Sequence, residues 1–357
     1  MVRVLFVGES WFGSSARSLR EALARLPEIY LDDIGEDLYM PKGRAPIVRA
    51  CNRVLRPWYQ VELAAEIERR LIMLGPDVLV VYKGNLVEAE TVERAKARGV
   101  RTINVFPDFS PHAYGGQLKE AMGAYDLVVS TKPFHPEHWQ RTYGYRNPCV
   151  FVPHGYDPAV HHWPDLPVEQ DFDVVMVAGW RPEYERLVVQ LATLIRESSV
   201  SVALAGPGWA DRRQLFPGRW HFPGAPHGRS YGELLRRGKI VIAPVQTEFI
   251  IDGARQPGDQ DTTRTYELAA AHCFFLHRRT PYVRTIYDEA TEVPMWDDAT
   301  ELAALIRRYL PLDDVRQEMA AAAHRRAVPA YSIPSRAESV LAHIRSLASR
   351  RDERDGR

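Results

Sequence analysis

The alternation of apolar runs with helical patterns begins twice in this sequence, and that repetition limits the possible folds more than any other feature. Candidate strands of the first series lie at residues 2–8, 77–82, 101–106, 126–130 and 149–153. The second series opens on another strand that ends in glycine, with candidates at 171–179, 200–206, 239–245 and 273–277. Strands that alternate with helices favour a parallel sheet covered on both faces. We therefore expect an α/β protein with two Rossmann-like domains.

A stretch rich in proline and histidine separates the two series. We expect an N-terminal domain at 1–155, a C-terminal domain at 171–330 and a linker between them. The histidines His154, His161 and His162 lack the i, i+4 spacing of a helical metal pair, so they are interpreted as linker residues.

The bulk composition excludes several classes of protein. Basic and acidic residues number 46 each, so we expect no global attraction to nucleic acid or to anionic membranes. No apolar run approaches the ~18–20 residues of a membrane span. Cys51, Cys149 and Cys273 form neither a CxxC motif nor a cysteine–histidine cluster, which indicates no disulfide framework and no structural zinc. A cytoplasmic location is the expectation. The charge run at 351–357 is predicted to be a frayed tail.

Three strand ends of the second half carry candidate ligand-binding residues, because open parallel sheets bind ligands at the carboxyl ends of their strands. These ends are Gly179 to Arg181, Gly206 to Trp209, and the loop from 246 to 265. A helix that begins near Thr263 would direct backbone N–H groups at a phosphate. Hydroxyl donors and a forked cation accompany that helix start, in Thr262, Thr263 and Arg264. Arg181 is a second candidate cation, although an arginine at a helix start is commonly a surface residue.

Two carboxylates flank this candidate phosphate-binding turn. Glu267 lies one turn into the helix, where a carboxylate can accept the hydroxyls of a ribose. Asp259 lies eight positions earlier and can accept the hydroxyls of a sugar. The alternative is that Asp259 and Asp261 solvate or cap a loop and that Glu267 is an exposed helix residue.

These segments, in this order, resemble the GT-B-fold glycosyltransferases, in the CgeB-like (spore maturation) branch of the glycosyl transferases group 1. The stretch DQDTTRTYE is similar to the E-x7-E motif of retaining members, with Asp in place of the first Glu. Further similar segments are VYKGN (81–85), FVPHGYDPAVH (151–161), LAGPGW (204–209), TTRTYELAAAHCFFL (262–276) and YSIPSRAESVLAHI (331–344). The resemblance implies two Rossmann-like domains whose parallel sheets face a central cleft, and a closing helix at 331–350 that packs back on the N-terminal domain.

The resemblance also implies roles for individual residues. Glu267 would bind the ribose of a UDP-, GDP- or TDP-sugar, Asp259 the donor sugar, and Thr263, Arg264 and Arg181 the diphosphate. The loop containing Phe222, Pro223 and Gly224 would hold the base through its backbone. The members that carry E-x7-E retain the anomeric configuration, so retention is expected here. No DxD stands at a strand end, and we predict an enzyme without metal or other cofactor.

The acceptor is expected at the strand ends of the N-terminal domain. Candidate binding residues are Gly8, Glu9, Ser10, Lys83 and Asn85. Asp108 and His112 directly follow a strand and are candidates for acceptor activation. Alternatively, Asp108 caps a turn after Pro107, His112 is exposed to solvent, and Lys83 is the exposed end of its strand.

Three functions remain open at this point. The first is a retaining nucleotide-sugar glycosyltransferase, the second a sugar-nucleotide epimerase of the same fold, and the third a non-catalytic nucleotide-sugar-binding module. The sequence does not reveal the donor sugar, the base, the acceptor or the oligomeric state.

Overall fold

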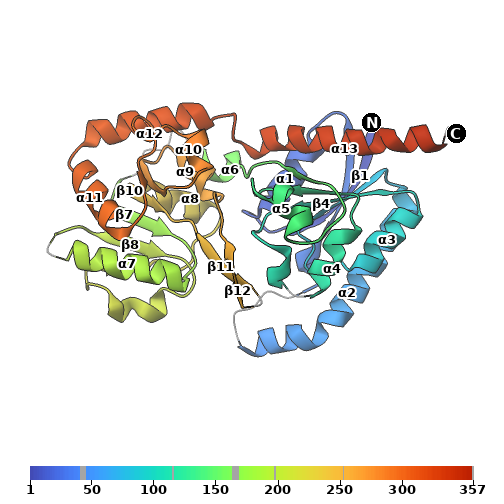
Figure 1. Ribbon diagram of the computed structural model, residues 1–357, viewed down its shortest axis with the longest axis horizontal. Coiled ribbons are helices and arrows are strands. Elements are labelled where there is room, and N and C mark those ends of the chain that lie inside the picture. The colour runs from blue at the N-terminus through green and yellow to red at the C-terminus, as the bar shows by residue number, and fades with distance from the viewer. Residues whose placement is uncertain (41–45, 115, 163–168, 197, 252, 356–357) are drawn as a thin grey trace. The chain divides into compact units, whose positions relative to one another are not determined.

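The computed structural model describes residues 1–40, 46–114, 116–162, 169–196, 198–251 and 253–355. The chain forms two compact units (Figure 1). The first unit comprises Met1–His154 together with Ile333–Arg357, and the second comprises Gly155–Ser332. Each unit is an α/β structure built on its own parallel sheet.

The sheet of the first unit has the strand order β2-β1-β3-β4-β5-β6, and every neighbouring pair is parallel. Its strands are β1 (Val2–Gly8), β2 (Ile29–Gly35), β3 (Val78–Tyr82), β4 (Arg101–Phe106), β5 (Leu127–Ser130) and β6 (Cys149–Phe151). The helices of this unit are α1 (Ser15–Ala24), α2 (Pro46–Leu74), α3 (Ala89–Ala97), α4 (Gly116–Ala124), α5 (His135–Arg141) and α13 (Ile333–Asp355), with short 3-10 turns η1 (Glu36–Leu38) and η2 (Pro111–Tyr114).

Both faces of this sheet are buried, which explains why its strands read as continuous apolar runs. Along β1, Val4 and Phe6 pack on the face that α1 and α13 cover. Leu5 and Val7 alternate with them and pack on the opposite face, under α2, α3, α4 and α5. Alternate side chains of a strand point to opposite faces, so one apolar run supplies two core layers.

Helix α13 belongs to the first unit although it follows the second unit in the sequence. It packs along α1, as Figure 1 shows. Val340 and Ile344 are completely or almost completely buried in the layer that covers Val4 and Phe6. Arg345 forms an ion pair of 2.5 Å with Glu28, just before β2.

The sheet of the second unit has the order β14-β13-β10-β7-β8-β9 and is also parallel throughout. Its strands are β7 (Phe172–Val177), β8 (Val202–Ala205), β9 (Trp220–His221), β10 (Gly238–Ala243), β13 (Phe275–Arg278) and β14 (Met295–Trp296). The helices are α6 (Pro158–His161), α7 (Pro182–Leu194), α8 (Arg229–Arg236), α9 (Arg264–Ala270), α10 (Val283–Ile286), α11 (Ala299–Tyr309) and α12 (Asp313–Ala327), with the 3-10 turn η3 (Ala210–Leu215). A separate antiparallel hairpin joins β11 (Glu248–Ile251) to β12 (Ala254–Pro257).

Two layers again cover this second sheet. One face packs under α7, α11 and part of α12, with Val188 and Ile306 in its core. The other face packs under α8 and α9, with Leu235 and Leu268 in its core. The short helix α9 is therefore held from below by the sheet, and its first residue follows the loop that leaves β10.

The prediction of two parallel-sheet α/β domains is confirmed, while several elements depart from the sequence-based expectations. Strand β2, helix α2 and the β11–β12 hairpin were not predicted. The predicted frayed tail is helical as far as Asp355, and residues 356–357 lie outside the described residues. In the part of the chain that the structure describes, none of the helices combines the length and the apolar character that crossing a bilayer requires.

The packing of α13 leads to a test of unit stability. We expect Ile344→Ala to destabilise the first unit by about 2–5 kcal/mol, because it removes a fully buried side chain and leaves a cavity. Hydrogen exchange followed by mass spectrometry should show faster exchange in β1 and β3 and no change in β7 and β10. Glu338→Ala, at an exposed position of the same helix, is the matched control. Equal acceleration in both units would contradict this assignment of α13.

Candidate functional site

Backbone hydrogen bonds join the two ends of the β11–β12 hairpin within the loop between β10 and α9. The backbone N–H of Gly258 donates to Thr247 O at 2.8 Å, and that of Asp259 donates to Gln246 O at 2.9 Å. A Cβ at Gly258 would lie 2.2 Å from Gln246 O, so only glycine fits this close approach. The N–H and hydroxyl of Thr247 donate to Glu183 in the first turn of α7. These bonds fix the backbone of Asp259 beside the start of α7.

Charged residues from three segments act on one buried hydroxyl. Burial raises the pKa of the Tyr184 phenol, the charges of Arg264 and Arg181 lower it, and those of Asp259 and Glu183 raise it. Such interactions act over at most about a Debye length, so these charged side chains all lie near Tyr184. The structure therefore brings together Arg181, Asp259 and Arg264, which the sequence assigned to one site.

Buried polar atoms of this loop lack hydrogen-bond partners within the described part of the chain. They are Gln246 Oε1, Thr262 Oγ1 and Arg264 Nε. The Arg264 guanidinium donates from Nη2 to Pro244 O at 3.3 Å. Buried polar groups in folded proteins are normally satisfied, so a cluster of such atoms indicates a place where a polar ligand or water binds.

Glu267 is buried and oriented by two neighbouring helices. Its side chain accepts a hydrogen bond from Tyr231 of α8 at 2.6 Å, and its other oxygen lies 3.7 Å from His161 Nε2 of α6. The residue is only 9% exposed, so the alternative of an exposed helix residue is wrong. Desolvation and the Glu267 carboxylate raise the pKa of the Tyr231 phenol, which keeps its proton available for this bond.

The sequence interpretation of the three histidines as linker residues is also wrong. His161 is buried in α6, a helix that Asp157 caps by accepting from Ala159 N at 2.9 Å. The Asp-Pro pair at 157–158 is a helix-start signal that would have identified it. His162 stacks on His324 at 5.3 Å, and His154 is buried in the first unit, where its Nε2 lies 3.0 Å from Thr131 Oγ1.

The turns that follow β7 and β8 pass very close to each other, and glycine residues allow this approach. Gly206 has φ +125°, and a Cβ there would lie 2.1 Å from Ala178 O, so the position requires glycine. Its N–H donates to Gly224 O at 2.6 Å, while Trp180 N donates to Pro207 O at 2.9 Å. Gly179, Gly206 and Gly224 therefore lie next to one another.

The side chains of Phe222 and Thr263, two residues of the predicted nucleotide site, have environments that limit the contacts they can make with a ligand. Phe222 packs on the core with Phe216, their ring centroids 5.9 Å apart, so only its backbone is suited to reach a ligand. Thr263 is the N-cap residue of α9 and makes no side-chain capping bond. Because α9 has only seven residues, the side chains of Arg264 and Arg181 supply most of the positive charge at this edge.

In the first unit, polar residues gather at the carboxyl ends of β1, β3 and β4. Lys83, whose φ is +61°, forms an ion pair of 2.8 Å with Asp108. The alternative in which Lys83 is only the exposed end of its strand does not describe this pair. Glu9 accepts from Trp11 Nε1 at 2.7 Å, and Ser10 donates from both its N–H and its hydroxyl to Asp37.

The other predicted acceptor residues have different environments. Gly8 is tightly surrounded, since a Cβ would lie 3.0 Å from Phe6 and 3.1 Å from Tyr82. Asn85 accepts from Arg56 Nη2 at its carbonyl at 2.6 Å. His112 lies in η2 and packs edge-on against Tyr143, 5.2 Å between centroids.

Glu36 is a buried carboxyl at this edge that the sequence did not single out. It is 4% exposed and accepts from the backbone N–H of Leu86. Burial raises its pKa to about 7, with Glu9 raising it further and the Leu86 N–H, Lys83 and Arg56 lowering it. It follows a strand, β2, that was not predicted, and it approaches Leu86 only through tertiary packing.

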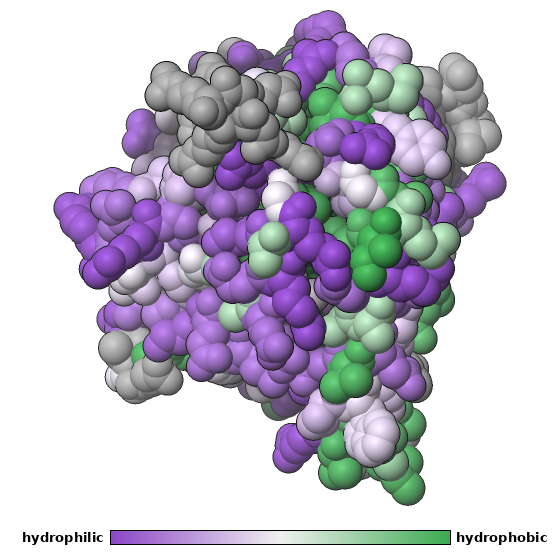
Figure 2. Space-filling view, turned by 90° about the vertical axis from the view of Figure 1, so that its right-hand side faces the viewer, coloured by the Kyte–Doolittle hydropathy of each residue, from purple (hydrophilic) through white to green (hydrophobic). Residues whose placement is uncertain are grey.

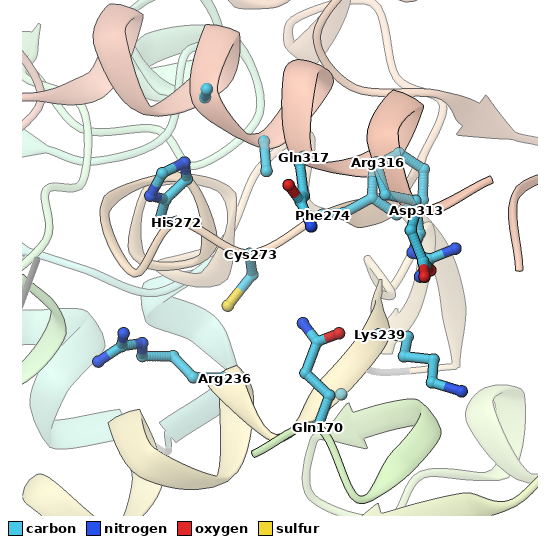
Figure 3. A pocket seen from close by; sticks show the side chains of 12 residues that line it. Gln170, Arg236, Lys239, His272, Cys273, Phe274, Asp313, Arg316 and Gln317 are labelled. Carbon is cyan, nitrogen blue, oxygen red and sulfur yellow. The ribbon is translucent and has the colours of Figure 1, made fainter. Parts of the chain in front are cut away.

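A cavity of about 700 Å³ lies at the opposite edge of the second sheet (Figure 3). Gln170, Lys239 and Phe274 line it at the amino ends of β7, β10 and β13, together with Arg236 and Cys273. Burial raises the pKa of the Cys273 thiol to about 12, so it is not a nucleophile. In the described residues, no group of three histidine, cysteine, aspartate or glutamate side chains is arranged to hold a metal ion.

Comparison with known proteins relates part of the chain to a protein family. Residues 181–342 match the family model described as glycosyl transferase-like. This stretch is similar to that family and covers less than half of the chain. It contains Arg181, Gly206, Asp259, Arg264 and Glu267. No curated protein sequence matches the chain.

Solved structures share the fold of the whole chain. Sucrose-phosphate synthase from Thermosynechococcus elongatus has a TM-score of 0.70 at 13% identity, covering 98% of this chain and 100% of its own. HepE of Anabaena in complex with UDP-glucose has a TM-score of 0.68 at 11% identity, covering 97% and 100%. AviGT4, a glycosyltransferase involved in avilamycin A biosynthesis, has a TM-score of 0.60 at 16% identity, covering 98% of each chain. The chain therefore has the GT-B fold, and the match of residues 181–342 to the glycosyl transferase-like model supports a glycosyltransferase.

The environment of Glu36 leads to a prediction of pH-dependent stability. The folded protein holds the Glu36 proton between pH 4.5 and about 7, where an unfolded chain has lost it. The free energy of unfolding therefore falls as the pH rises through this window, by about 3 kcal/mol for this group. Glu36→Gln keeps the acceptor for Leu86 N–H and should remove this component.

Urea unfolding of both proteins at a series of pH values measures the effect. The difference in unfolding free energy, wild type minus Glu36→Gln, should decline from pH 4.5 to 7 and stay constant outside that range. Glu62→Gln, on the exposed surface of α2, serves as the control. Parallel curves for wild type and Glu36→Gln would contradict the burial of a protonated carboxyl.

Proposed function

We propose that the protein transfers a sugar from a nucleoside-diphosphate donor to an acceptor hydroxyl, without a metal ion and with retention of anomeric configuration. The observation that carries this proposal is the clustering of Arg181, Asp259, Arg264 and Thr262 inside the stretch that matches the family model. These side chains combine cations, a carboxylate and an unsatisfied hydroxyl at the carboxyl edge of a parallel sheet. We also propose membership of the CgeB-like branch, on the segments that resemble it.

The diphosphate is assigned to Arg264 and Arg181. The buried Nε of Arg264 is a donor without a protein acceptor in the described residues, and a phosphate oxygen satisfies it. Thr262 Oγ1 and the backbone of Thr263 are the proposed additional contacts. Two guanidinium groups neutralise the charge that develops on the leaving diphosphate, which is the function that a divalent cation serves elsewhere.

The ribose is assigned to Glu267. Tyr231 and His161 hold its carboxylate in place, and a carboxylate has about four acceptor positions, so it can accept ribose hydroxyls as well. The backbone at Gly179, Gly206 and Gly224 is the proposed support for the nucleotide. HepE was solved with UDP-glucose, and uracil is accordingly the first base to test here, before guanine and thymine.

The reaction breaks the bond between the anomeric carbon and the diphosphate oxygen and forms a bond from that carbon to the acceptor oxygen. Asp259 is the proposed contact of the donor sugar. On the first unit, Lys83 holds the Asp108 carboxylate at 2.8 Å, and we assign this pair to the acceptor hydroxyl, whose proton Asp108 accepts. Glu9, Ser10, Asn85 and His112 remain proposed acceptor contacts.

Two other functions make different predictions. An epimerase of the same fold would change the sugar without consuming the nucleotide-sugar, and a non-catalytic module would bind it without change. Release of UDP from a UDP-sugar, with or without an acceptor, separates the transferase from both. The proposed location is the cytoplasm, which suits a nucleotide-sugar donor and the absence of disulfides among Cys51, Cys149 and Cys273.

Substitution of the diphosphate and ribose contacts tests the donor site. Arg264→Ala should weaken UDP binding by about 10- to 100-fold, because it removes a charge-assisted hydrogen bond. Glu267→Gln should weaken it less, because the amide keeps an acceptor for Tyr231. Isothermal titration calorimetry with UDP measures both, with Arg186→Ala on the exposed side of α7 as the control. Unchanged affinity in both variants would eliminate this donor site.

Asp259 separates sugar contact from nucleotide binding. Asp259→Asn should lower the rate of donor consumption by at least about ten-fold while leaving UDP affinity within about two-fold, because the carboxylate contacts the sugar only. Asp211→Asn, at an exposed position of η3, is the matched control. An equal loss of UDP affinity would assign Asp259 to the nucleotide instead.

A further inference from the structure

The first four turns of α2 expose an apolar stripe on the first unit. Ile47 is 72% exposed, Val54 75% and Trp58 70%, and Leu55 and Val61 are exposed as well. Isolated apolar side chains on a surface are ordinary, whereas five within the first four turns of one helix are not. In Figure 2, hydrophobic residues gather at the lower tip of the molecule, at the height that the start of α2 occupies in Figure 1.

The spacing shows that the stripe is one continuous face. At 3.6 residues per turn, nine residues make two and a half turns, so residues nine apart lie on opposite sides of the helix. Val54 lies nine residues before Leu63, and Trp58 lies nine before Ile67. Leu63 and Ile67 are completely buried in the core, so the stripe points directly away from the sheet.

The charge of these turns is uniformly positive. Residues 46–61 contain Arg49, Arg53 and Arg56 and no aspartate or glutamate. Arg49 and Arg53 are exposed on the polar side of the same turns, whereas Arg56 is half-buried against Asn85. An apolar face that includes tryptophan, backed by long basic side chains, is the pattern of a helix that lies in a membrane interface.

We propose that residues 47–61 of α2 are a docking surface for an anionic lipid bilayer. The apolar stripe enters the boundary between headgroups and acyl chains, with Trp58 at the interface, and Arg49 and Arg53 reach the phosphate groups around it. A second copy of this chain is a poorer occupant, because it would bring the same two arginines and no acidic partner in these turns. The inference is independent of the donor site, which lies in the second unit.

Co-sedimentation of the full chain with vesicles tests this surface. We expect binding to vesicles of about 30% phosphatidylglycerol in phosphatidylcholine, at least about ten-fold weaker binding to pure phosphatidylcholine, and loss of binding at high salt. The double variant Val54→Asp/Trp58→Asp should lose at least about ten-fold in vesicle binding. Ile250→Asp, at a 79% exposed apolar position of β11, should bind as the wild type does.

Two further measurements make the outcome decisive. The midpoint of urea unfolding of Val54→Asp/Trp58→Asp should match that of the wild type when followed by hydrogen exchange in β1 and β3, which shows that the first unit of the variant is folded. Vesicle binding without UDP binding by the wild type would support the docking surface and reject the proposed function. Absence of vesicle binding overturns the inference, as does equal binding by the double variant. A concentration-dependent dimer that Trp58→Asp abolishes, with no vesicle binding, would assign the stripe to a second copy instead.

Discussion

Parallel pairing in both sheets is the constraint on which the rest of the structure depends. Parallel strands must be joined by crossovers, and those crossovers bury both faces of each sheet under helices. Polar chemistry is then excluded from the faces and collects where the strands end. The pair of Lys83 with Asp108 and the group around Arg264 both occupy such carboxyl edges.

The proposed donor site depends on contacts within the protein as well as on groups that would touch the ligand. Tyr231 and His161 come from two other helices and orient Glu267, and the close approach of Gly206 to Ala178 holds the turns after β7 and β8 together. A side chain at position 206 would separate these turns even though it touches no substrate. The geometry of the site is therefore distributed over most of the second unit.

The sequence was informative where physical signals are local. Apolar runs located most strands of both sheets, and the polar turn before an apolar run located the start of α9. Strand β2 was missed because Asp32 and Asp33 interrupt its apolar pattern, and helix α2 was missed because Pro57 lies inside it. Tyr231 and Glu36 were missed because each becomes a neighbour of the site only through tertiary packing, which no local pattern reports.

The place of α13 has a consequence for the order in which the molecule forms. The second unit is one continuous segment, whereas the first needs a helix whose residues follow that segment in the chain. During synthesis, β1 and β3 leave the ribosome long before Val340 and Ile344, so one face of their sheet is covered only in part, by α1, while residues 155–332 are being translated. The second unit can thus complete its folding first, and the first unit passes through a stage with exposed apolar surface that a chaperone would recognise.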